Sequence, residues 1–443
     1  MTSAHAISEH TAENTTICVV GLGHIGLPIA LLLAQDSDVV GVDIDVNRVA
    51  TLRKRRPPFD EPRLTELLSS ASDSFTVRTD IPDPNATDSR GDRQEIDTYL
   101  LATPTPFDIA TQVANVEYVR TAVESVAEVL APGDLVVLES TVPPGTTERL
   151  VLPILERSDA GPGGFSYAYC PERALPGNTI SEMIHNDRVV GGIDTESNVR
   201  AAELYGFVEG AVHTTDPTSA EFVKLIENTY RDVNIALANE LGKLAEQYGI
   251  DGRAAIALAN EHPRVDILSP GPGVGGHCIP IDPRFLTQLS TDSRLISLAR
   301  EVNDTMPVHV LDLVREVVPT RVDCRLTVLG VAYKSGVDDT RESPALRFVR
   351  LAENEGYDVR AHDPHVETFD CVLDDLEASV EGSDCLVLLT AHPEFDTLEP
   401  DALVSLMRHP NVVDARGVFD QAAWETAGFS VRRLADGSRP RRQ

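Results

Sequence analysis

Lysine is scarce in this chain of 443 residues: only Lys54, Lys224, Lys243 and Lys334 occur, against 34 arginines. Long apolar runs are missing too, and no stretch approaches the roughly 20 apolar residues of a membrane-spanning helix. The first dozen residues lack a basic region and an apolar stretch, so we expect no signal peptide and a cytoplasmic protein. The sequence therefore does not point to a membrane or to export.

Positive charge is scarce overall, because 38 lysines and arginines stand against 70 acidic residues and leave a formal net charge of −32. An acidic excess spread along the whole chain argues against nucleic acid or an anionic membrane as the partner. We interpret it as adaptation to high salt, a hypothesis that denaturation curves with and without molar salt would test. In such a composition, a lysine that remains is expected to have a specific task.

Cysteine is sparse and forms no paired pattern. Six cysteines occur without a CxxC pair or His/Cys ligand spacing, so we expect reduced thiols and no metal site. One of them, Cys278, stands in "GPGVGGHCIPID", residues 271–282, where glycine and proline predict a loop. A structural cysteine is normally a small buried hydrophobe, whereas loop glycines indicate a close approach to the backbone. The loop predicts a thiol with a substrate against it, and a bystander thiol is the alternative.

The N-terminal region has the pattern of a dinucleotide-binding unit. A short apolar run ends at Val20, G-x-G-x-x-G follows as Gly21-Leu22-Gly23-His24-Ile25-Gly26, and a second strand ends in Asp43. Gly21 is expected to make the turn, Gly23 to admit the pyrophosphate and Gly26 to permit helix–strand contact. The helix N-terminus would face the phosphates, and Asp43 would bind the adenosine ribose, favouring NAD over NADP. A βαβ turn that binds no nucleotide is the alternative.

The rest of the pattern predicts an α/β chain of two or three domains. Apolar strands are expected at 99–106, 135–146, 166–177 and 188–192, the first three ending in loops that line the crevice of an open parallel sheet. A polar surface insertion is expected at 82–95. A long helix at 219–248 has an apolar stripe and is expected to pair with its copy in a dimer. From residue 324 an α/β pattern restarts without G-x-G-x-x-G, so a second dinucleotide site is not expected.

Eight motifs, in order, resemble the UDP-glucose/GDP-mannose dehydrogenase family from about residue 14 to the end of the chain. They are "GLGHIG", "ATPTP", "ESTVPPGT", "PERALPG", "EFVKLIEN", "GPGVGGHCIPID", "YKSGVDDTRESP" and "DARG". The resemblance implies two NAD-dependent oxidations that convert the C6 alcohol of a nucleotide sugar to a carboxylate. "GGHC" and "YCPERALPG" are similar to the branch that oxidises UDP-N-acetylmannosamine, with UDP-N-acetylglucosamine and UDP-glucose as alternatives. One departure is Ile281, where the family often has lysine before the aspartate.

The resemblance also implies an architecture of two Rossmann-like doubly wound domains joined by a central helical region with a long connecting helix. The expected parts are a flexible tail (1–13), an NAD-binding domain (14–215), a central helical and dimerisation domain with the Cys278 loop (216–320), and a C-terminal UDP-sugar-binding domain (321–443).

Roles at the reacting carbon are implied by the same resemblance. Cys278 would add to the intermediate aldehyde, giving a thiohemiacetal and then a thioester. Lys224 and Asn228, four residues apart on the predicted helix, would stabilise the oxyanion on C6. The side chains expected to position or deprotonate water are those of Glu172, Asp282 and Thr141. Whether Lys224 or a water held by Asp282 acts as the first general base stays open, and a solvated helix lysine is the alternative for Lys224.

Binding residues are carried over motif by motif. The expected cofactor contacts are Gly21, Gly23, His24, Ile25, Gly26, Asp43, Arg48, Thr103, Thr141 and Arg341. The expected substrate contacts are Glu172, Arg173, Leu175, Lys224, Asn228, Arg264, Gly273, Gly275, Gly276, Tyr333, Lys334 and Arg416, of which a partner subunit can supply Arg264. Two other classes compete with this interpretation. A single-step β-hydroxyacid dehydrogenase would yield one NADH per substrate and an NAD-binding regulatory protein none, whereas the thiol mechanism yields two.

Overall fold

The computed structural model describes residues 16–83, 96–108, 111–175, 177–288, 290, 292–318 and 323–437. They form two compact units that divide between Leu225 and Ile226, inside the long helix α8 (Pro217–Tyr248). The predicted tail, 1–13, and most of the predicted surface insertion, 82–95, lie outside the described residues. Within the described ranges, no helix combines the length and the apolar character that crossing a bilayer requires.

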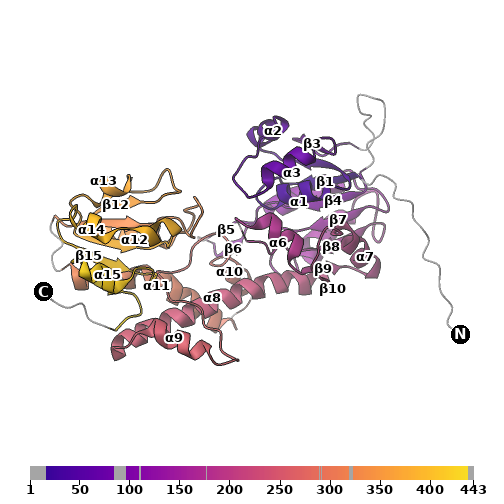
Figure 1. The fold of residues 1–443 in the computed structure, drawn as a ribbon. Helices are drawn as coiled ribbons and strands as arrows, with labels where there is room; N and C mark the ends of the chain where they lie inside the picture. The colour runs from indigo at the N-terminus through magenta and orange to yellow at the C-terminus, as the bar shows by residue number, and fades with distance from the viewer. Residues whose placement is uncertain are drawn as a thin grey trace. The chain divides into compact units, whose positions relative to one another are not determined.

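The first unit is built on an eight-stranded sheet of the described residues, in the order β10-β9-β8-β7-β4-β1-β2-β3 (Figure 1). Its strands are β1 (Thr16–Val20), β2 (Asp38–Val42), β3 (Phe75–Arg78), β4 (Thr98–Leu101), β7 (Leu135–Leu138), β8 (Ser166–Tyr169), β9 (Arg188–Gly192) and β10 (Val212–Thr215). The helices are α1 (Gly26–Leu33), α2 (Val46–Arg53), α3 (Leu64–Ser70), α4 (Glu117–Ala127), the π-helical turn η1 (Thr147–Val151), α5 (Leu152–Leu155), α6 (Thr179–His185) and α7 (Thr195–Leu204). A short antiparallel pair, β5 (Phe107–Asp108) and β6 (Val113–Ala114), stands apart from this sheet.

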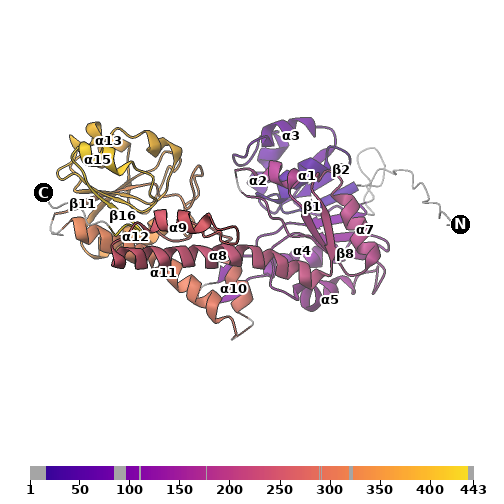
Figure 2. The ribbon, with the colours of Figure 1, turned by 60° about the horizontal axis from the view of Figure 1, so that its bottom comes forward.

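The inner strands of this sheet are buried on both faces, as expected of a sheet covered by helices on both sides. In β1, Ile17 and Val19 pack into one hydrophobic cluster, and Cys18 between them packs into another. Helices α1, α3, α6 and α7 contribute to the first cluster, whereas α4 and α5 contribute to the second. Figure 2 shows α1 and α3 on one side of the sheet and α4 and α5 on the other.

From β3 to β8 the strand order is that of the doubly wound dinucleotide-binding fold, with its switch point between β1 and β4. The prediction of a parallel sheet is wrong at one place, because β9 runs antiparallel to β8, with Tyr169 opposite Gly191. The antiparallel run places the amino end of β9 beside the carboxyl end of β8, which is the edge where functional loops of such sheets gather.

The second unit repeats the same strand order in a six-stranded sheet of described residues, β13-β12-β11-β14-β15-β16. Its strands are β11 (Arg325–Leu329), β12 (Asp358–His362), β13 (Val372–Leu373), β14 (Cys385–Leu388), β15 (Asn411–Asp414) and β16 (Ser430–Arg433). The helices after α8 are α9 (Gly252–Asn260), α10 (Asp282–Thr287), α11 (Arg294–Val317), α12 (Pro344–Asn354), α13 (Leu376–Val380), the 3-10 turn η2 (Pro393–Thr397), α14 (Pro400–Val404) and α15 (Gln421–Thr426). Apolar residues of α11 and α12 cover one face of this sheet, and those of α13, α14 and α15 cover the other.

The predicted fold class is confirmed: two doubly wound sheets are present, with helical chain between them in sequence. The three-domain division stays a prediction, because compactness separates only the two units.

Candidate functional site

Two of the three motif glycines are required by the chain's own backbone. Gly21 has φ +94°, and a Cβ there would lie 2.5 Å from the carbonyl oxygen of Ala102. A Cβ on Gly26 would lie 1.8 Å from the carbonyl oxygen of Gly21. At Gly23, by contrast, no described atom lies within 4 Å of such a Cβ. The open side of Gly23 is therefore the place where a pyrophosphate can reach the backbone, and the loop fits NAD.

Asp43, directly after β2, is buried and fastens the glycine loop. Its Oδ2 accepts hydrogen bonds from the backbone N–H of Leu22 at 2.8 Å and from Nη1 of Arg48 at 2.7 Å. Its Oδ1 accepts the N–H of Asp45 at 2.9 Å. A carboxylate has about four acceptor positions, so one remains on Oδ1 for a ribose hydroxyl. Arg48, predicted as a cofactor contact, is thus the ion-pair partner of the predicted ribose acceptor.

The other predicted cofactor residues of this unit lie nearby in sequence or at the next strand ends. The His24 ring packs 4.2 Å from the ring of Phe59, and Ile25 is half-buried against the core. Thr103, in the loop after β4, has its Oγ1 3.4 Å from Oγ of Ser140. Thr141 is half-buried in the loop after β7. Their contacts with a cofactor stay predictions.

Glu172 lies just beyond the end of β8, is 9% exposed, and is held by three hydrogen bonds. Its Oε1 accepts the backbone N–H groups of Arg173 at 2.6 Å and Ala174 at 2.7 Å. Its Oε2 accepts Nη2 of Arg188 at 2.7 Å. The carboxylate therefore has a fixed orientation.

Arg188 lies between two carboxylates, because its Nη1 donates to Oε1 of Glu139 at 3.1 Å. The hydroxyl of Tyr205 donates to the same Oε1 at 2.7 Å. Burial raises the pKa of Glu139 to about 7, although the charge of Arg188 opposes that shift. Sequence reasoning missed both Glu139 and Arg188. The available signal was their position, since one follows an apolar strand and the other opens one.

The other predicted residues of the first unit, Arg173, Leu175 and Lys224, make separate contacts and do not form one cluster. Nη2 of Arg173 donates to the carbonyl of Asp187 at 2.5 Å, and the N–H of Leu175 donates to Oε2 of Glu182 at 2.9 Å. Lys224 is half-buried on α8 and forms no ion pair with any residue that the structure describes. An ammonium group without a carboxylate partner can stabilise a negative charge on a ligand.

In the second unit, the turn after Cys278 is fastened to α8. The carbonyl of Cys278 accepts the N–H groups of Ile281 at 3.0 Å and Asp282 at 2.8 Å, where α10 begins. Nδ2 of Asn228 donates to Oδ2 of Asp282 at 2.5 Å, and both side chains are buried. Three of the predicted catalytic residues, Cys278, Asn228 and Asp282, are therefore brought together.

Glycines of the Cys278 loop pack against other segments of the same unit. A Cβ on Gly273 would lie 3.0 Å from the carbonyl oxygen of Asn303, and one on Gly275 would lie 2.6 Å from that of Glu342. At Gly276, with φ +86°, it would lie 2.8 Å from the ring of Tyr333. The absent Cβ atoms therefore make room for other parts of the same unit, and the predicted contacts of these glycines with a substrate stay predictions.

Charged and aromatic groups of the segment after β11 adjoin this loop. Arg341 accepts the N–H of Gly276 on its carbonyl at 3.0 Å, and its Nη2 donates to Oδ2 of Asp339 at 2.7 Å. Burial, followed by the negative charges of Asp339 and Cys278, raises the pKa of Tyr333 to about 12. The Tyr333 hydroxyl therefore stays protonated at neutral pH and can donate. Asp339 was missed by sequence reasoning, and the predicted contact of Arg341 with NAD stays a prediction.

Cys278 is more accessible than four of the other five cysteines. Four of them, Cys18, Cys170, Cys324 and Cys385, are buried, whereas Cys278 and Cys371 are half-buried. Burial raises the pKa of Cys18, Cys324 and Cys371 to about 12, that of Cys170 to about 11, and that of Cys385 well above its usual range. Because the thiolate is the nucleophile, these five are poor candidates near neutral pH.

Arg416 is the predicted phosphate contact whose surroundings support that role best. Its Nε donates to the carbonyl of Leu389 at 2.7 Å, and a Cβ on Gly271 would lie 3.1 Å from its Nη1. Burial, and then the neighbouring charge of Arg253, lower the pKa of Arg416 to about 10. Within the described chain, neither arginine forms an ion pair with a carboxylate. An anion bound there would relieve their repulsion.

Two other predicted substrate residues are only located. Arg264 is exposed and donates its N–H to Nδ1 of His262 at 3.3 Å, and Lys334 is half-buried in the segment after β11. Their contacts with a substrate stay predictions.

A buried polar chain holds the start of the Cys278 loop. Oδ1 of Asn239 accepts the N–H of Gly271 at 2.8 Å, and its Nδ2 donates to Oδ1 of Asn303 at 2.9 Å. Nδ2 of Asn303 donates to Oδ1 of Asp232 at 2.8 Å. The loop is thereby tied to α8 and α11.

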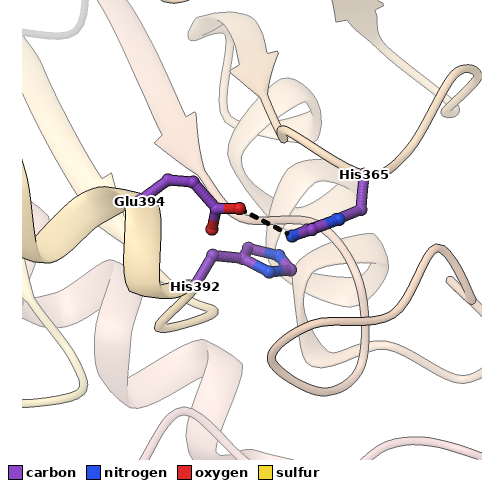
Figure 3. A group of neighbouring side chains, drawn as sticks. All are labelled: His365, His392 and Glu394. Atoms are coloured by element: carbon purple, nitrogen blue, oxygen red, sulfur yellow. Dashed lines mark ion pairs between the residues drawn. The ribbon is translucent and has the colours of Figure 1, made fainter. Parts of the chain in front are cut away.

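Among the described residues, His365, His392 and Glu394 form a cluster with the composition of a metal site (Figure 3). Nε2 of His365 lies 3.2 Å from Oε1 of Glu394. Both ring nitrogens of His392 are already used, because Nδ1 accepts the N–H of Gly336 at 3.1 Å and Nε2 lies 3.0 Å from Oδ2 of Asp363. This assigns the proton to Nε2. An ion could bind His392 only by breaking one of these bonds, so the ring is better understood as a connector.

Three sequence profiles of one family match the chain in order. The NAD binding domain of the UDP-glucose/GDP-mannose dehydrogenase family matches residues 15–208, its central domain 218–305 and its UDP binding domain 327–421.

Individual relatives cover nearly the whole chain. A UDP-N-acetyl-D-mannosamine dehydrogenase from Methanocaldococcus jannaschii is 40% identical over 428 residues, 95% of this chain and 96% of the relative. The solved structure of a UDP-D-ManNAc dehydrogenase from Pyrococcus horikoshii has a TM-score of 0.87 and 38% identity, and covers 96% of this chain and 100% of its own. An NDP-N-acetyl-D-galactosaminuronic acid dehydrogenase from Ralstonia solanacearum is 39% identical over 422 residues, 91% of this chain and 96% of the relative.

Glu139→Gln tests the buried carboxyl beside Arg188. Because folding raises the pKa of Glu139 from 4.5 to about 7, its contribution to stability is fully present below about 4.5 and is lost as the pH rises through about 7. Glutamine resembles the protonated acid, so the variant should lose less free energy of unfolding than the wild type over that pH range. Denaturant unfolding across the range measures this, with the exposed Glu156→Gln as the control. Parallel curves for Glu139→Gln and the wild type would contradict the shift.

Proposed function

The chain belongs to the UDP-glucose/GDP-mannose dehydrogenase family, and from this we propose that it oxidises the C6 alcohol of UDP-N-acetyl-D-mannosamine to the carboxylate. The coarser activity is that of an NAD-dependent UDP-sugar dehydrogenase. The observation that carries the choice of sugar is the name shared by the relatives that cover 95–96% of this chain. Family membership removes the single-step β-hydroxyacid dehydrogenase and the regulatory protein as alternatives.

Cys278 is proposed as the nucleophile that makes the second oxidation possible. In the first oxidation, a C6–H bond breaks with its electron pair passing to NAD, and the hydroxyl loses its proton, leaving an aldehyde. The thiolate then forms a C–S bond with C6, giving a thiohemiacetal whose remaining hydride passes to a second NAD. Water adds to the resulting thioester, the C–S bond breaks, and the carboxylate and the thiolate are released. The support is the accessibility of Cys278 and the raised pKa of the other five thiols.

Charge stabilisation and water activation are proposed for other side chains. Lys224 would stabilise the oxyanion that develops on C6 in both oxidations, and its lack of a carboxylate partner among the described residues supports this role. Asn228 would hold Asp282 through their 2.5 Å hydrogen bond. Glu172 would take a proton from the hydrolytic water, with Thr141 as an additional contact.

Nucleotide recognition is proposed to divide between the two repeated sheets. NAD is the cofactor of this family domain, and we assign its pyrophosphate to the Gly21–Gly26 loop and its adenosine ribose to Asp43. For the substrate, Arg416 and Lys334 would meet the diphosphate, and Tyr333 would donate a hydrogen bond from its protonated hydroxyl.

Substrate choice is tested by measuring product and NADH together. With UDP-N-acetyl-D-mannosamine, we expect two NADH per uronate formed and the highest kcat/KM of a panel. The panel would include UDP-N-acetylglucosamine, UDP-N-acetylgalactosamine and UDP-glucose. A higher kcat/KM for another sugar would overturn the choice of epimer, whereas one NADH per product would overturn the two-step chemistry.

Cys278→Ser should largely abolish uronate formation. A serine hydroxyl stays protonated at neutral pH, and an ester hydrolyses more slowly than a thioester, so any covalent product should accumulate. Intact-protein mass spectrometry after mixing with UDP-sugar and NAD would detect that adduct. The half-buried Cys371→Ser is the matched control and should retain wild-type turnover. Uronate formation by Cys278→Ser at close to the wild-type rate would exclude the thioester route.

Lys224→Ala should slow both oxidations, because an oxyanion develops in each. Loss of one such stabilising contact typically lowers the rate about 10²–10³-fold. Lys243, half-buried on the same helix, supplies the control Lys243→Ala, which should leave the rate unchanged. Single-turnover NADH formation measures each step, and equal small effects of the two variants would remove Lys224 from the mechanism.

We also propose a homodimer that pairs α8 with its copy. Six large apolar side chains lie exposed along one stripe of this helix: Phe222 at 46%, Ile226 at 44%, Tyr230 at 56%, Leu237 at 50%, Leu244 at 40% and Tyr248 at 79%. A two-fold axis lets one such stripe bury itself against an identical one. Light scattering in salt that preserves activity should give twice the chain mass, and Leu237→Glu should reduce it. A monodisperse active monomer would refute the dimer.

A further inference from the structure

Strand direction determines which side chain faces Glu172. In the antiparallel pair β8–β9, Ala168 pairs with Gly192 and Tyr169 with Gly191. Continuing this register three residues past Tyr169 brings Glu172 opposite Arg188, the first residue of β9. In a parallel pair, Arg188 would start at the opposite edge of the sheet, away from Glu172. The one departure from a parallel sheet among the described strands of this sheet therefore creates the contact between Arg188 and Glu172.

Hydrogen bonds leave only one carboxylate oxygen of Glu172 able to accept a proton. Oε1 already accepts two backbone N–H groups, from Arg173 and Ala174, which fill its acceptor positions. Among described residues, Oε2 accepts only Nη2 of Arg188, at 2.7 Å, and keeps one position. A proton taken by Glu172 would therefore go to the same oxygen that Arg188 holds.

Arg188 is in turn fixed from its other side. Its Nη1 lies 3.1 Å from Oε1 of Glu139 and 3.6 Å from Sγ of Cys170. Its guanidinium carbon lies 4.3 Å from the ring centroid of Tyr205. Oε2 of Glu139 is buried and accepts no hydrogen bond from any residue in the described ranges. Burial raises the pKa of Glu139 to about 7 and that of Cys170 to about 11. Two buried carboxylates and one guanidinium sum to zero charge when Glu139 carries a proton.

We propose that Arg188 is the positioning residue for Glu172. In this proposal Glu139 is a buried, protonated acid, so the positive charge of Arg188 pairs with the carboxylate of Glu172. The proposal rests on the function proposed above, in which Glu172 receives a proton from the water that attacks the thioester. The water oxygen bonds to C6, its proton goes to Oε2 of Glu172, and the C–S bond to Cys278 breaks. Arg188 sets where that oxygen lies, and Glu139, while it carries a proton, does not compete with Glu172 for the charge of Arg188.

The test compares Glu172→Gln with the double variant Arg188→Met/Glu139→Gln. Removing Arg188 together with the charge of Glu139 avoids leaving Glu139 as a second unpaired buried carboxylate beside Glu172. In stopped flow with UDP-N-acetyl-D-mannosamine and NAD, the double variant should give a fast burst of two NADH per subunit. Uronate release should then be slower by about 10²-fold, the lower end of the range of general acid–base catalysis. Intact-protein mass spectrometry should show the acyl adduct on Cys278.

Controls separate positioning from structural damage. Arg200→Met removes another half-buried arginine of the same unit and should keep wild-type burst and release. Arg188→Lys retains the cation at a shorter reach and should release uronate at an intermediate rate. This variant tests the proposal if the double variant fails to fold. Equal slowing of burst and release in both Arg188 variants would mean a structural role and would overturn the proposal.

Glu172→Gln separates the role of Glu172 from that of Arg188. If it releases uronate at the wild-type rate, the proposed role of Glu172 fails, and that of Arg188 fails with it. If Glu172→Gln accumulates the adduct while Arg188→Met/Glu139→Gln or Arg188→Lys releases uronate within twofold of the wild type, only the positioning role is overturned. Adduct accumulation in both, with a normal burst, supports it.

Discussion

At the switch point of each sheet stands a glycine beside which there is no room for a Cβ, and the geometry of the loop depends on it. A Cβ on Gly21 would lie 2.5 Å from the carbonyl oxygen of Ala102, and one on Gly330, with φ +81°, would lie 2.5 Å from that of Thr390. In both sheets the acid that ends the second strand then accepts N–H groups of the loop, since Asp43 binds Leu22 and Asp363 binds Val331. These contacts hold the loop close to the neighbouring strand, at the switch point where the ligand-binding crevice of such a sheet lies.

The two sheets share this arrangement but differ in the loop residues that follow the glycine. Beyond Gly21, the open side of Gly23 leaves the backbone accessible to a pyrophosphate. Beyond Gly330, the chain carries Tyr333 instead, and Gly336 donates its N–H to the buried ring of His392. Although burial opposes its ionisation, hydrogen bonds from His392 and from backbone N–H groups lower the pKa of Asp363 to about 2, so this anchor stays charged. The same fold therefore supplies one loop for a dinucleotide and another that presents side chains.

Local sequence was sufficient for the fold and for the glycine loops, because both depend on spacing along the chain. Strand periodicity, the motif from Gly21 to Gly26 and the acid at Asp43 each reflect a local requirement. The direction of β9 does not: residues 188–192 are as apolar as a parallel strand, and pairing with β8 is decided by packing. Arg188 and Glu139 were missed for that reason, since a side chain's partner across a sheet has no fixed sequence separation. The neighbours that fill the Cβ positions of Gly273, Gly275 and Gly276 could not be predicted either, because they lie elsewhere in the chain.

Rigidity of the Cys278 loop has a chemical reason under the proposed mechanism. Three attachments hold the loop within its unit: Gly271 to Asn239, Gly276 to Arg341, and Asp282 to Asn228. Two hydrides must leave the same carbon, and the nucleotide that receives the first has to be exchanged before the second. During that exchange a free aldehyde could diffuse away, whereas a C–S bond to a fixed thiol keeps C6 in place. Holding the thiol rigidly, and not the sugar alone, therefore lets one site carry out both oxidations.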